Sequence, residues 1–318
     1  MLSIHQVTTS NSIMFVGGIG RTLGNSVTRR AAYGASNFKI MTGLTCARRT
    51  YATEEKPKKK QQGGDISQVP VQNIGVMADF YIPPQFKNCP VSSWPKLVWR
   101  RLGLFVVNTY SIAKYKRETK LKLKFNDWKE LAMEQFVRTN KVFSAACNKK
   151  FTERKDYITK QLKDTAGIEV IRNLVERAQT FPNGTKISWE LVNIESNPKV
   201  ISFNALPDSS NLTVYVQFIM KVTTKQKVTI VQNDTTKETE NVVTDNLVYT
   251  LDPFNDDQKL VGSLFESDHI RKVQPDASLI NPKVMMAFTR VCGDLYRSNP
   301  KAKKDDSNKD DSKKTESK

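Results

Sequence analysis

The segment NLTVYVQFIMKV, residues 211–222, sets the fold class of this chain of 318 residues. Apolar side chains occupy every second position from Leu212 to Val222, which is the two-residue period of a β-strand. The alternation begins at Ile187 and continues through 228–230, 242–251 and 259–265, while QNDTT at 232–236 is typical of a hairpin turn. Strands that follow one another without intervening helices pair antiparallel. The second half is therefore predicted to form an antiparallel sheet.

Helical periodicity precedes the sheet. A first helix is expected over 96–116, with Trp99, Leu102, Val106 and Ala113 on one face. A second begins at Asn126 or Asp127, a third covers 165–179, and 281–292 forms a closing helix or strand. The stripe of the second helix is Trp128, Leu131, Ala132, Phe136, Phe143, Ala146 and Cys147. The fold class is therefore α+β, with N-terminal helices packed on the sheet.

The composition limits the protein classes that are possible. Hydrophobic residues make up 38% of the chain, as in an ordinary globular protein. No apolar run approaches the ~20 residues that a transmembrane helix needs. The four cysteines, at positions 46, 89, 147 and 292, are too few and too scattered for a disulfide scaffold.

The regions that flank the folded part are polar or rich in proline. Five prolines make 65–95 an extended lead-in, whose apolar residues favour packing on a surface. The linker 52–64 and the tail 301–318 are dominated by charged and small polar residues, so both are expected to be disordered. The α+β domain is accordingly predicted to span 96–300.

Residues 1–51 have the composition of a mitochondrial targeting segment. They contain six Lys and Arg residues, no Asp or Glu, and many Ser, Thr and Gly. The sequence Arg49-Thr50-Tyr51-Ala52 resembles a matrix-processing site, with a first cut after Thr50 and removal of Tyr51 leaving Ala52 as the first residue.

The residues that support catalysis or metal binding are scarce. After residue 51 the one histidine is His269, and the remaining cysteines lie 58 and 145 positions apart. No metal-ligand spacing, nucleophile elbow or phosphate loop is present. Neither a cofactor nor a metal is expected, and the protein is predicted not to be an enzyme. The one enzymatic alternative is a pocket with Glu190 or Asp245 facing inward.

Positive charge is concentrated in one segment. Residues 96–129 contain ten basic and two acidic residues, a net charge of +8, which equals the net charge of all of 65–300. Aromatic residues interleave the cations, a pattern that suits RNA phosphates and bases or an anionic membrane surface. The composition leaves these two partners open, and Trp94 and Trp99 are expected in the core, with lipid anchoring as the alternative. The candidate rRNA-binding or anionic-lipid-binding residues are Arg100, Arg101, Lys114, Lys116, Arg117, Lys120, Lys122 and Lys124.

Several blocks resemble a known family. These are MADFYIPPQFKNCP at 77–90, Arg100-Arg101-Leu102, PNGT at 182–185, VGSLFES at 261–267 and GDLYR at 293–297. Over about 65–300 the chain resembles the fungal mitochondrial inner-membrane ribosome receptors. These are relatives of mitoribosomal large-subunit protein forty-five and of the C-terminal domain of the import protein Tim-forty-four.

The resemblance implies a cone-like α+β fold with a curved sheet. It also implies a peripheral protein on the matrix side of the mitochondrial inner membrane. Such a protein holds the ribosome through large-subunit rRNA and aids cotranslational insertion of nascent membrane proteins with the oxidase-assembly insertase. The main alternative is an integral structural protein of the mitoribosomal large subunit. The blocks at 261–267 and 293–297 are expected to be packing elements and turns.

Overall fold

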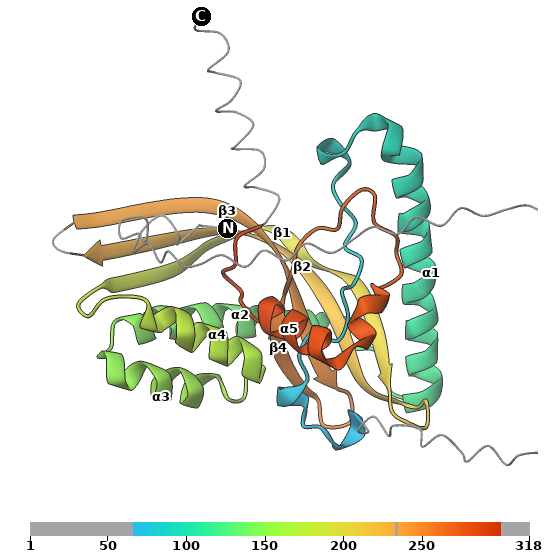
Figure 1. The fold of residues 1–318 in the computed structure, drawn as a ribbon, viewed down its shortest axis with the longest axis horizontal. Coiled ribbons are helices and arrows are strands. Elements are labelled where there is room, and N and C mark those ends of the chain that lie inside the picture. The colour runs from blue at the N-terminus through green and yellow to red at the C-terminus, as the bar shows by residue number, and fades with distance from the viewer. Residues whose placement is uncertain (1–65, 233–234, 300–318) are drawn as a thin grey trace, which may run out of the picture. The chain divides into compact units, whose positions relative to one another are not determined.

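A computed structural model describes residues 66–232 and 235–299. The predicted targeting segment with its processing site, the linker 52–64 and the tail 301–318 lie outside the described residues. The sheet is antiparallel with strand order β1-β2-β3-β4, and Gln232 pairs with Thr235 across the predicted hairpin (Figure 1). The strands are β1 (Lys186–Pro207), β2 (Thr213–Gln232), β3 (Thr235–Asp252) and β4 (Asp257–Leu264).

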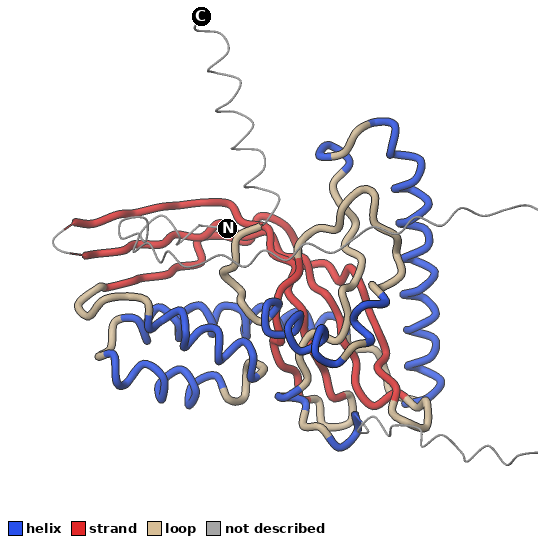
Figure 2. The backbone as a smooth tube through the Cα atoms, viewed as in Figure 1, coloured by secondary structure: helices blue, strands red, loops and turns tan. Residues whose placement is uncertain are grey.

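The predicted helices are present, and one helix was missed. Short 3-10 turns occupy 66–68, 71–73, 86–88, 91–93 and 277–280, and the segment over 281–292 is a helix. The helices are α1 (Trp94–Thr119), α2 (Phe125–Cys147), α3 (Phe151–Leu162), α4 (Ile168–Gln179) and α5 (Pro282–Cys292). Figure 2 shows that the long strands bend along their length, and β1 carries register shifts between Leu191 and Ser202. The α+β class with a curved antiparallel sheet is thus confirmed.

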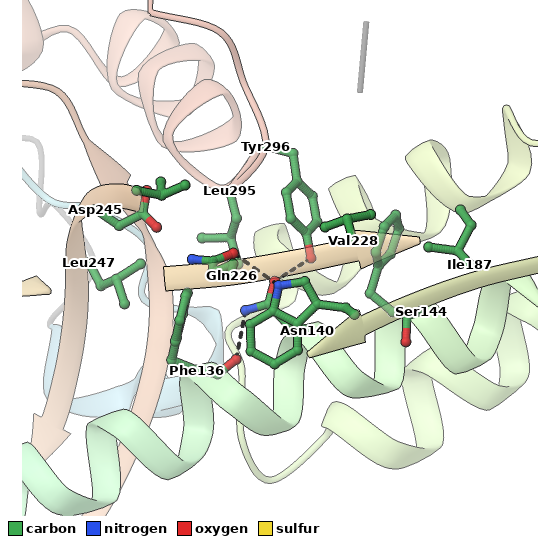
Figure 3. A pocket seen from close by; sticks show the side chains of 13 residues that line it. Phe136, Asn140, Ser144, Ile187, Gln226, Val228, Asp245, Leu247, Leu295 and Tyr296 are labelled. Carbon is green, nitrogen blue, oxygen red and sulfur yellow. Dashed lines mark hydrogen bonds between the residues drawn. The ribbon is translucent and has the colours of Figure 1, made fainter. Parts of the chain in front are cut away.

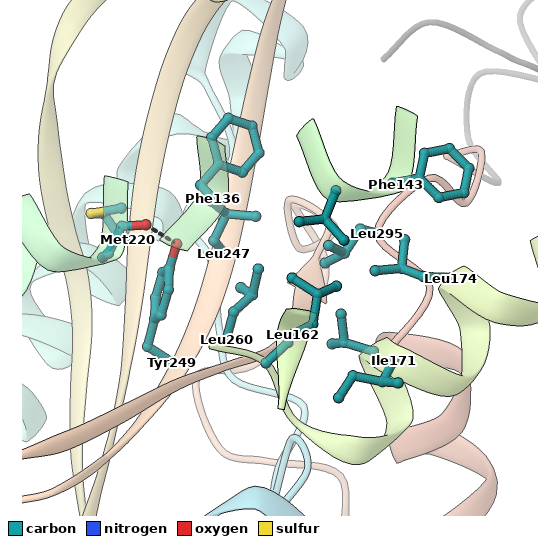
Figure 4. Packing of buried hydrophobic residues seen from close by; sticks show 14 of the residues in the cluster. Phe136, Phe143, Leu162, Ile171, Leu174, Met220, Leu247, Tyr249, Leu260 and Leu295 are labelled. Atoms are coloured by element: carbon teal, nitrogen blue, oxygen red, sulfur yellow. Dashed lines mark hydrogen bonds between the residues drawn. The ribbon is translucent and has the colours of Figure 1, made fainter. Parts of the chain in front are cut away.

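The main core lies between the sheet and α2, α3 and α4. Even-numbered side chains of β2 point to this layer, among them Phe218, which stacks 5.4 Å from Tyr249 and 6.4 Å from Trp128 between ring centroids. The Tyr249 hydroxyl donates a 2.7 Å hydrogen bond to the Ala132 carbonyl of α2 (Figure 4). The alternation of β2 therefore buries one row of side chains under the helices.

The opposite face of the sheet is covered by the lead-in and by α5. Ile219 and Val248 pack against Val76 and Ile82 in a second buried cluster. The side chain of Gln217 accepts a 3.0 Å hydrogen bond from the Met77 N–H and donates one of 2.8 Å to the Gly75 carbonyl. Both faces of the central strands are thus buried, and the lead-in is an ordered layer of the fold.

Helix α3 is held by a buried arginine. Arg154 is fully buried, and its guanidinium donates to the carbonyls of Cys147, Ala178 and Phe181 at 3.1, 2.8 and 2.6 Å. Cys147 ends α2 and Ala178 lies in the last turn of α4, where carbonyls lack helical partners and the helix dipole is negative. Among the described residues, this single cation therefore joins three helices without a carboxylate partner.

Asparagine side chains bind the outer edge of β1. The Asn108 amide of α1 donates to the Ile201 carbonyl at 2.8 Å and accepts from the Phe203 N–H at 3.1 Å. Asn148 makes the same pair of contacts with Ile187, at 3.0 and 2.6 Å. The two amides thus bind backbone groups on the open edge of β1, where no further strand of the described residues pairs with it. Through these bonds Asn108 holds α1 against that edge.

The blocks 261–267 and 293–297 pack against each other. A side chain at Gly262 would lie 2.5 Å from the Cys292 carbonyl oxygen, so the two segments approach closely because position 262 is glycine. The Arg297 guanidinium donates to the Ser263 carbonyl at 2.5 Å and lies 4.5 Å from the Phe265 ring centroid. Their role as packing elements agrees with the prediction.

Candidate functional site

Helix α1 has one face against the protein and one apolar face toward solvent. Leu97, Leu104 and Tyr115 are buried against the domain. The opposite side exposes large apolar side chains at helical spacing along much of the helix, which is ~39 Å long. We call this set the outer stripe, and its members are Val98, Trp99, Leu102, Phe105, Val106 and Tyr110.

This orientation corrects the expectation for the two tryptophans. Trp99 is 73% exposed and Trp94 is 40% exposed, so neither is a core residue. Apolar residues occur on both faces of α1, and a helix that is apolar all round has no periodicity that identifies its inner side. The hydrogen bonds of Asn108 with the edge strand β1 determine which face of α1 is turned toward the protein. The predicted face of Trp99, Leu102, Val106 and Ala113 is consequently the outer one.

The outer stripe borders a shallow, open depression lined by Phe105, Val106, Thr109, Tyr110 and Ala113. Soluble monomers rarely leave contiguous large apolar side chains in water, and such patches mark contacts with proteins or membranes. Trp and Tyr at the rim of an apolar surface are typical of side chains at a membrane–water boundary. The stripe can therefore enter a lipid interface without unfolding the domain.

Two predicted binding residues are engaged inside the protein. Arg100 donates to the carbonyls of His269 and Ile270, the second at 3.0 Å. Arg101 donates to the Pro84 carbonyl at 2.8 Å, and its guanidinium lies 4.0 Å from the Phe86 ring centroid. Both guanidinium groups thus fasten α1 to the lead-in and to the loop after β4.

Two further predicted residues bind neighbouring side chains. Lys114 donates to Asn211 Oδ1 at 3.0 Å, and Lys124 pairs with Asp256 at 2.8 Å. Glu118, the one acidic residue of α1, turns inward and accepts hydrogen bonds from the Thr213 N–H and hydroxyl at 2.9 and 2.6 Å. Desolvation opposes ionisation of this carboxyl, but the bonds from Thr213 outweigh it and lower its pKa.

The other four predicted cations lie at the C-terminal end of α1, on exposed positions. The Arg117 guanidinium is 76% exposed and lies 3.6 Å from Glu118. Within 66–232 and 235–299, the other three side chains have no hydrogen-bond or ion-pair partner, and Lys120 has the left-handed backbone (φ 58°) that ends the helix. We call these four residues the cationic end: Lys116, Arg117, Lys120 and Lys122.

The eight predicted residues therefore form separate groups. Arg101 and Lys116 are ~22 Å apart along the helix axis. The outer stripe runs from Val98 to Tyr110, and the cationic end follows it, so the exposed surface of α1 is apolar over its first part and cationic at its C-terminal end. Sequence reasoning missed this combination, although Phe105 and Val107, which widen the apolar face beyond one stripe, were a signal of it.

The described residues also contain a small cavity between α2, the sheet and the segment after α5 (Figure 3). Its volume is about 50 Å³, and its lining includes Asn140, Gln226, Asp245 and Tyr296. Burial raises the pKa of the Asp245 carboxyl to about 6. Burial also raises the pKa of the Tyr296 hydroxyl. Glu190, the second acid considered as a possible catalytic residue, is exposed and does not face the cavity. The cavity thus lacks a second group that could exchange protons with Asp245 near neutral pH.

The remaining chemistry of the described residues is sparse. His269 pairs with Asp268 at 2.8 Å, and no group of three potential metal ligands occurs within 66–232 and 235–299. Burial raises the pKa of the Cys147 and Cys292 thiols to about 12 and about 11, which makes both poor nucleophiles. In the same residues, no helix combines the length and apolarity required to cross a bilayer.

Comparison with known proteins agrees with the resemblance found in the sequence. A family model described as MBA1-like protein matches residues 59–301. A relative from Saccharomyces cerevisiae, named inner membrane mitoribosome receptor MBA1, mitochondrial, is 29% identical over 256 residues, which cover 78% of this chain and 86% of the relative. The family match includes every described residue and more than half of the chain. The chain therefore belongs to the family of MBA1-like proteins.

Proposed function

We propose that this protein is a peripheral receptor on the matrix side of the mitochondrial inner membrane, where it tethers the mitochondrial ribosome through large-subunit rRNA. The relative from Saccharomyces cerevisiae is named a mitoribosome receptor of the inner membrane, which supports the general role. The observation that carries the membrane part is the outer stripe of α1, with Trp99 73% and Tyr110 67% exposed. The role requires no chemistry at a reactive centre.

The outer stripe is the proposed membrane contact. A helix at a bilayer surface places apolar side chains at the boundary of headgroups and acyl chains, and its Trp and Tyr rings lie at headgroup level. Because Leu97, Leu104 and Tyr115 hold the inner face in the domain, α1 would contact lipid as part of a rigid body. The membrane contact then fixes the orientation of the whole domain.

The cationic end is the proposed contact with rRNA phosphates. Its four side chains are exposed cations, and the single acid of α1, which lies 3.6 Å from Arg117, is engaged through its other carboxylate oxygen by Thr213. Each phosphate that a cation neutralises makes binding more sensitive to salt, so four contacts give a logarithmic slope of about −3. Anionic lipid headgroups near the stripe offer the same chemistry, and experiment can separate the two.

Charge reversal separates rRNA from lipid. Glutamate at all four positions of the cationic end should weaken ribosome binding at least tenfold at moderate salt and flatten its salt dependence. The matched control reverses four exposed lysines elsewhere: Lys199, Lys237, Lys272 and Lys283. Selective loss of binding to anionic vesicles would assign the cationic end to lipid. Unchanged binding to both ribosomes and vesicles would remove it from the mechanism.

Tethering itself would assist membrane insertion. A ribosome held at the membrane raises the effective concentration of its nascent chain near an insertase without a new catalytic step. We propose nascent membrane proteins and the oxidase-assembly insertase as the partners in this step. Crosslinking of membrane-bound ribosomes during translation would test both contacts, and crosslinks confined to ribosomal proteins would argue against them.

The N-terminal segment fits the proposed location. We propose that residues 1–51 direct import and that processing at Arg49-Thr50-Tyr51-Ala52 leaves Ala52 at the start of the mature chain. Mass spectrometry of the protein isolated from mitochondria would identify the terminus. An intact Met1 or a start beyond residue 65 would contradict this assignment.

A salt wash distinguishes a receptor from an integral ribosomal subunit. A receptor bound mainly through phosphates should leave large subunits when salt is raised, because counterions compete for its contacts. Gradient sedimentation of lysed mitochondria at low and high salt measures this directly. Retention on the large subunit at high salt would favour the structural-subunit alternative.

A further inference from the structure

The cavity below the sheet contains an unused carboxylate. Within 66–232 and 235–299, the Asp245 side chain has no hydrogen-bond or ion-pair partner, although it lines the cavity (Figure 3). The other polar groups are occupied. Asn140 accepts from the Tyr296 hydroxyl at 2.6 Å and donates to the Phe136 carbonyl at 2.9 Å. Gln226 accepts from the Trp189 indole at 2.9 Å. Asp245 is therefore the acceptor left for a guest.

The walls of the cavity favour a cation with an apolar stem. Phe136 and Trp189 meet edge to face with their centroids 6.1 Å apart, and Phe143 and Tyr296 are 4.9 Å apart. Aromatic faces attract ammonium groups, and the attraction is stronger where water is excluded. An anion would meet the Asp245 carboxylate, while a neutral apolar guest would leave that carboxylate without a partner.

The size of the cavity limits the guest. A cavity of 150 Å³ encloses benzene, and this one measures about 50 Å³. It can admit the end of a small chain but not a nucleotide or a lipid tail. We propose that the cavity binds a primary alkylammonium group, with the ammonium on Asp245 and the methylenes between the aromatic side chains.

Two sources could supply this group. One is a free alkylamine, and the other is a lysine side chain. The sequence after residue 300 contains seven lysines and starts five positions beyond Tyr296, so its first lysine, Lys301, is within ~18 Å of chain reach from the cavity. Full-length protein in which these seven lysines are replaced by glutamine separates the two sources.

The test titrates the full chain with n-butylammonium chloride at constant ionic strength and follows the Trp189 indole resonance by NMR. Butanol is the neutral control ligand. Asp245→Asn should reduce the affinity for n-butylammonium at least tenfold. Glu190→Gln, which removes an exposed charge from β1, separated from β3 by β2, should leave it unchanged. Circular dichroism establishes that both variants fold.

The outcomes are decisive. Binding to the wild type that is lost in Asp245→Asn supports a free-amine site. Binding that appears or tightens only in the lysine-to-glutamine protein supports the site with the chain's own lysines as its occupant. Equal affinity for butylammonium and butanol, equal binding by Asp245→Asn, or no binding to any of the proteins would overturn the proposal. None of these results depends on ribosome or membrane binding.

Discussion

Replacing two side chains of the outer stripe should weaken membrane binding without weakening the fold. Trp99 and Phe105 are 73% and 66% exposed, so their removal takes little from the core. Burying a large apolar side chain completely stabilises by about 1.5–3 kcal/mol. With about two-thirds of each side chain available to lipid, the pair contributes about 2–4 kcal/mol of transfer free energy. Trp99→Gln/Phe105→Gln should therefore lower vesicle partitioning by roughly 30- to 700-fold.

Flotation with vesicles of zwitterionic and anionic phospholipids measures this partitioning. The matched control is Met286→Gln/Val291→Gln, which removes two exposed apolar side chains from α5. The control should float like the wild type, and both double variants should unfold at nearly the wild-type temperature. If Trp99→Gln/Phe105→Gln partitions within twofold of the wild type, the outer stripe does not enter lipid.

Three further predictions concern the rest of the domain. Arg154→Met should lower the free energy of unfolding by about 3–5 kcal/mol in urea titrations, because it leaves buried carbonyls unpaired; a loss below 1 kcal/mol would contradict its role as the link between helices. The raised pKa of Asp245 means that the folded state binds this proton more tightly than the unfolded state does. The free energy of unfolding should therefore fall as the pH is raised from about 4 to about 6. Asp245→Asn should remove that fall and stabilise by about 2–3 kcal/mol at pH 8, and parallel pH–stability curves for wild type and variant would refute this. Arg101→Met should lower the free energy of unfolding by about 1–2 kcal/mol, because it loses the hydrogen bond to the Pro84 carbonyl, and ribosome binding should stay unchanged. Weakened ribosome binding by a fully folded variant would show that Arg101 belongs to the interface.

The order of elements could be predicted because each long element has a clear period. In β2, the apolar side chains at even-numbered positions from Val216 to Val222 lie on one face of the strand. These side chains do pack under the helices. Helix α3 was missed because its buried set, Arg154, Ile158 and Leu162, includes a charged residue where the period requires an apolar one. The Arg154 side chain is buried by carbonyls from two helix ends that the sequence does not place together.

The candidate site was predicted only in part for a related reason. Charge density identified the right helix and the cationic end, but it could not separate exposed cations from those that bind backbone carbonyls. Arg100 and Arg101 are engaged by residues 269–270 and 84–86, which are distant in sequence or separated by several prolines. The outward direction of Trp99 likewise depends on the contacts of Asn108 with β1, which no local pattern contains.

Flotation of ribosomes with vesicles measures whether the protein joins the two. Purified mitochondrial ribosomes are mixed with anionic vesicles, with or without the mature protein, and floated in a density gradient. Ribosomes should float only when the protein is present. Trp99→Gln/Phe105→Gln should still sediment with ribosomes but should no longer float them. Ribosomes that stay at the bottom with wild-type protein, or that float equally with the double variant, would contradict a tether whose membrane contact is the outer stripe of α1.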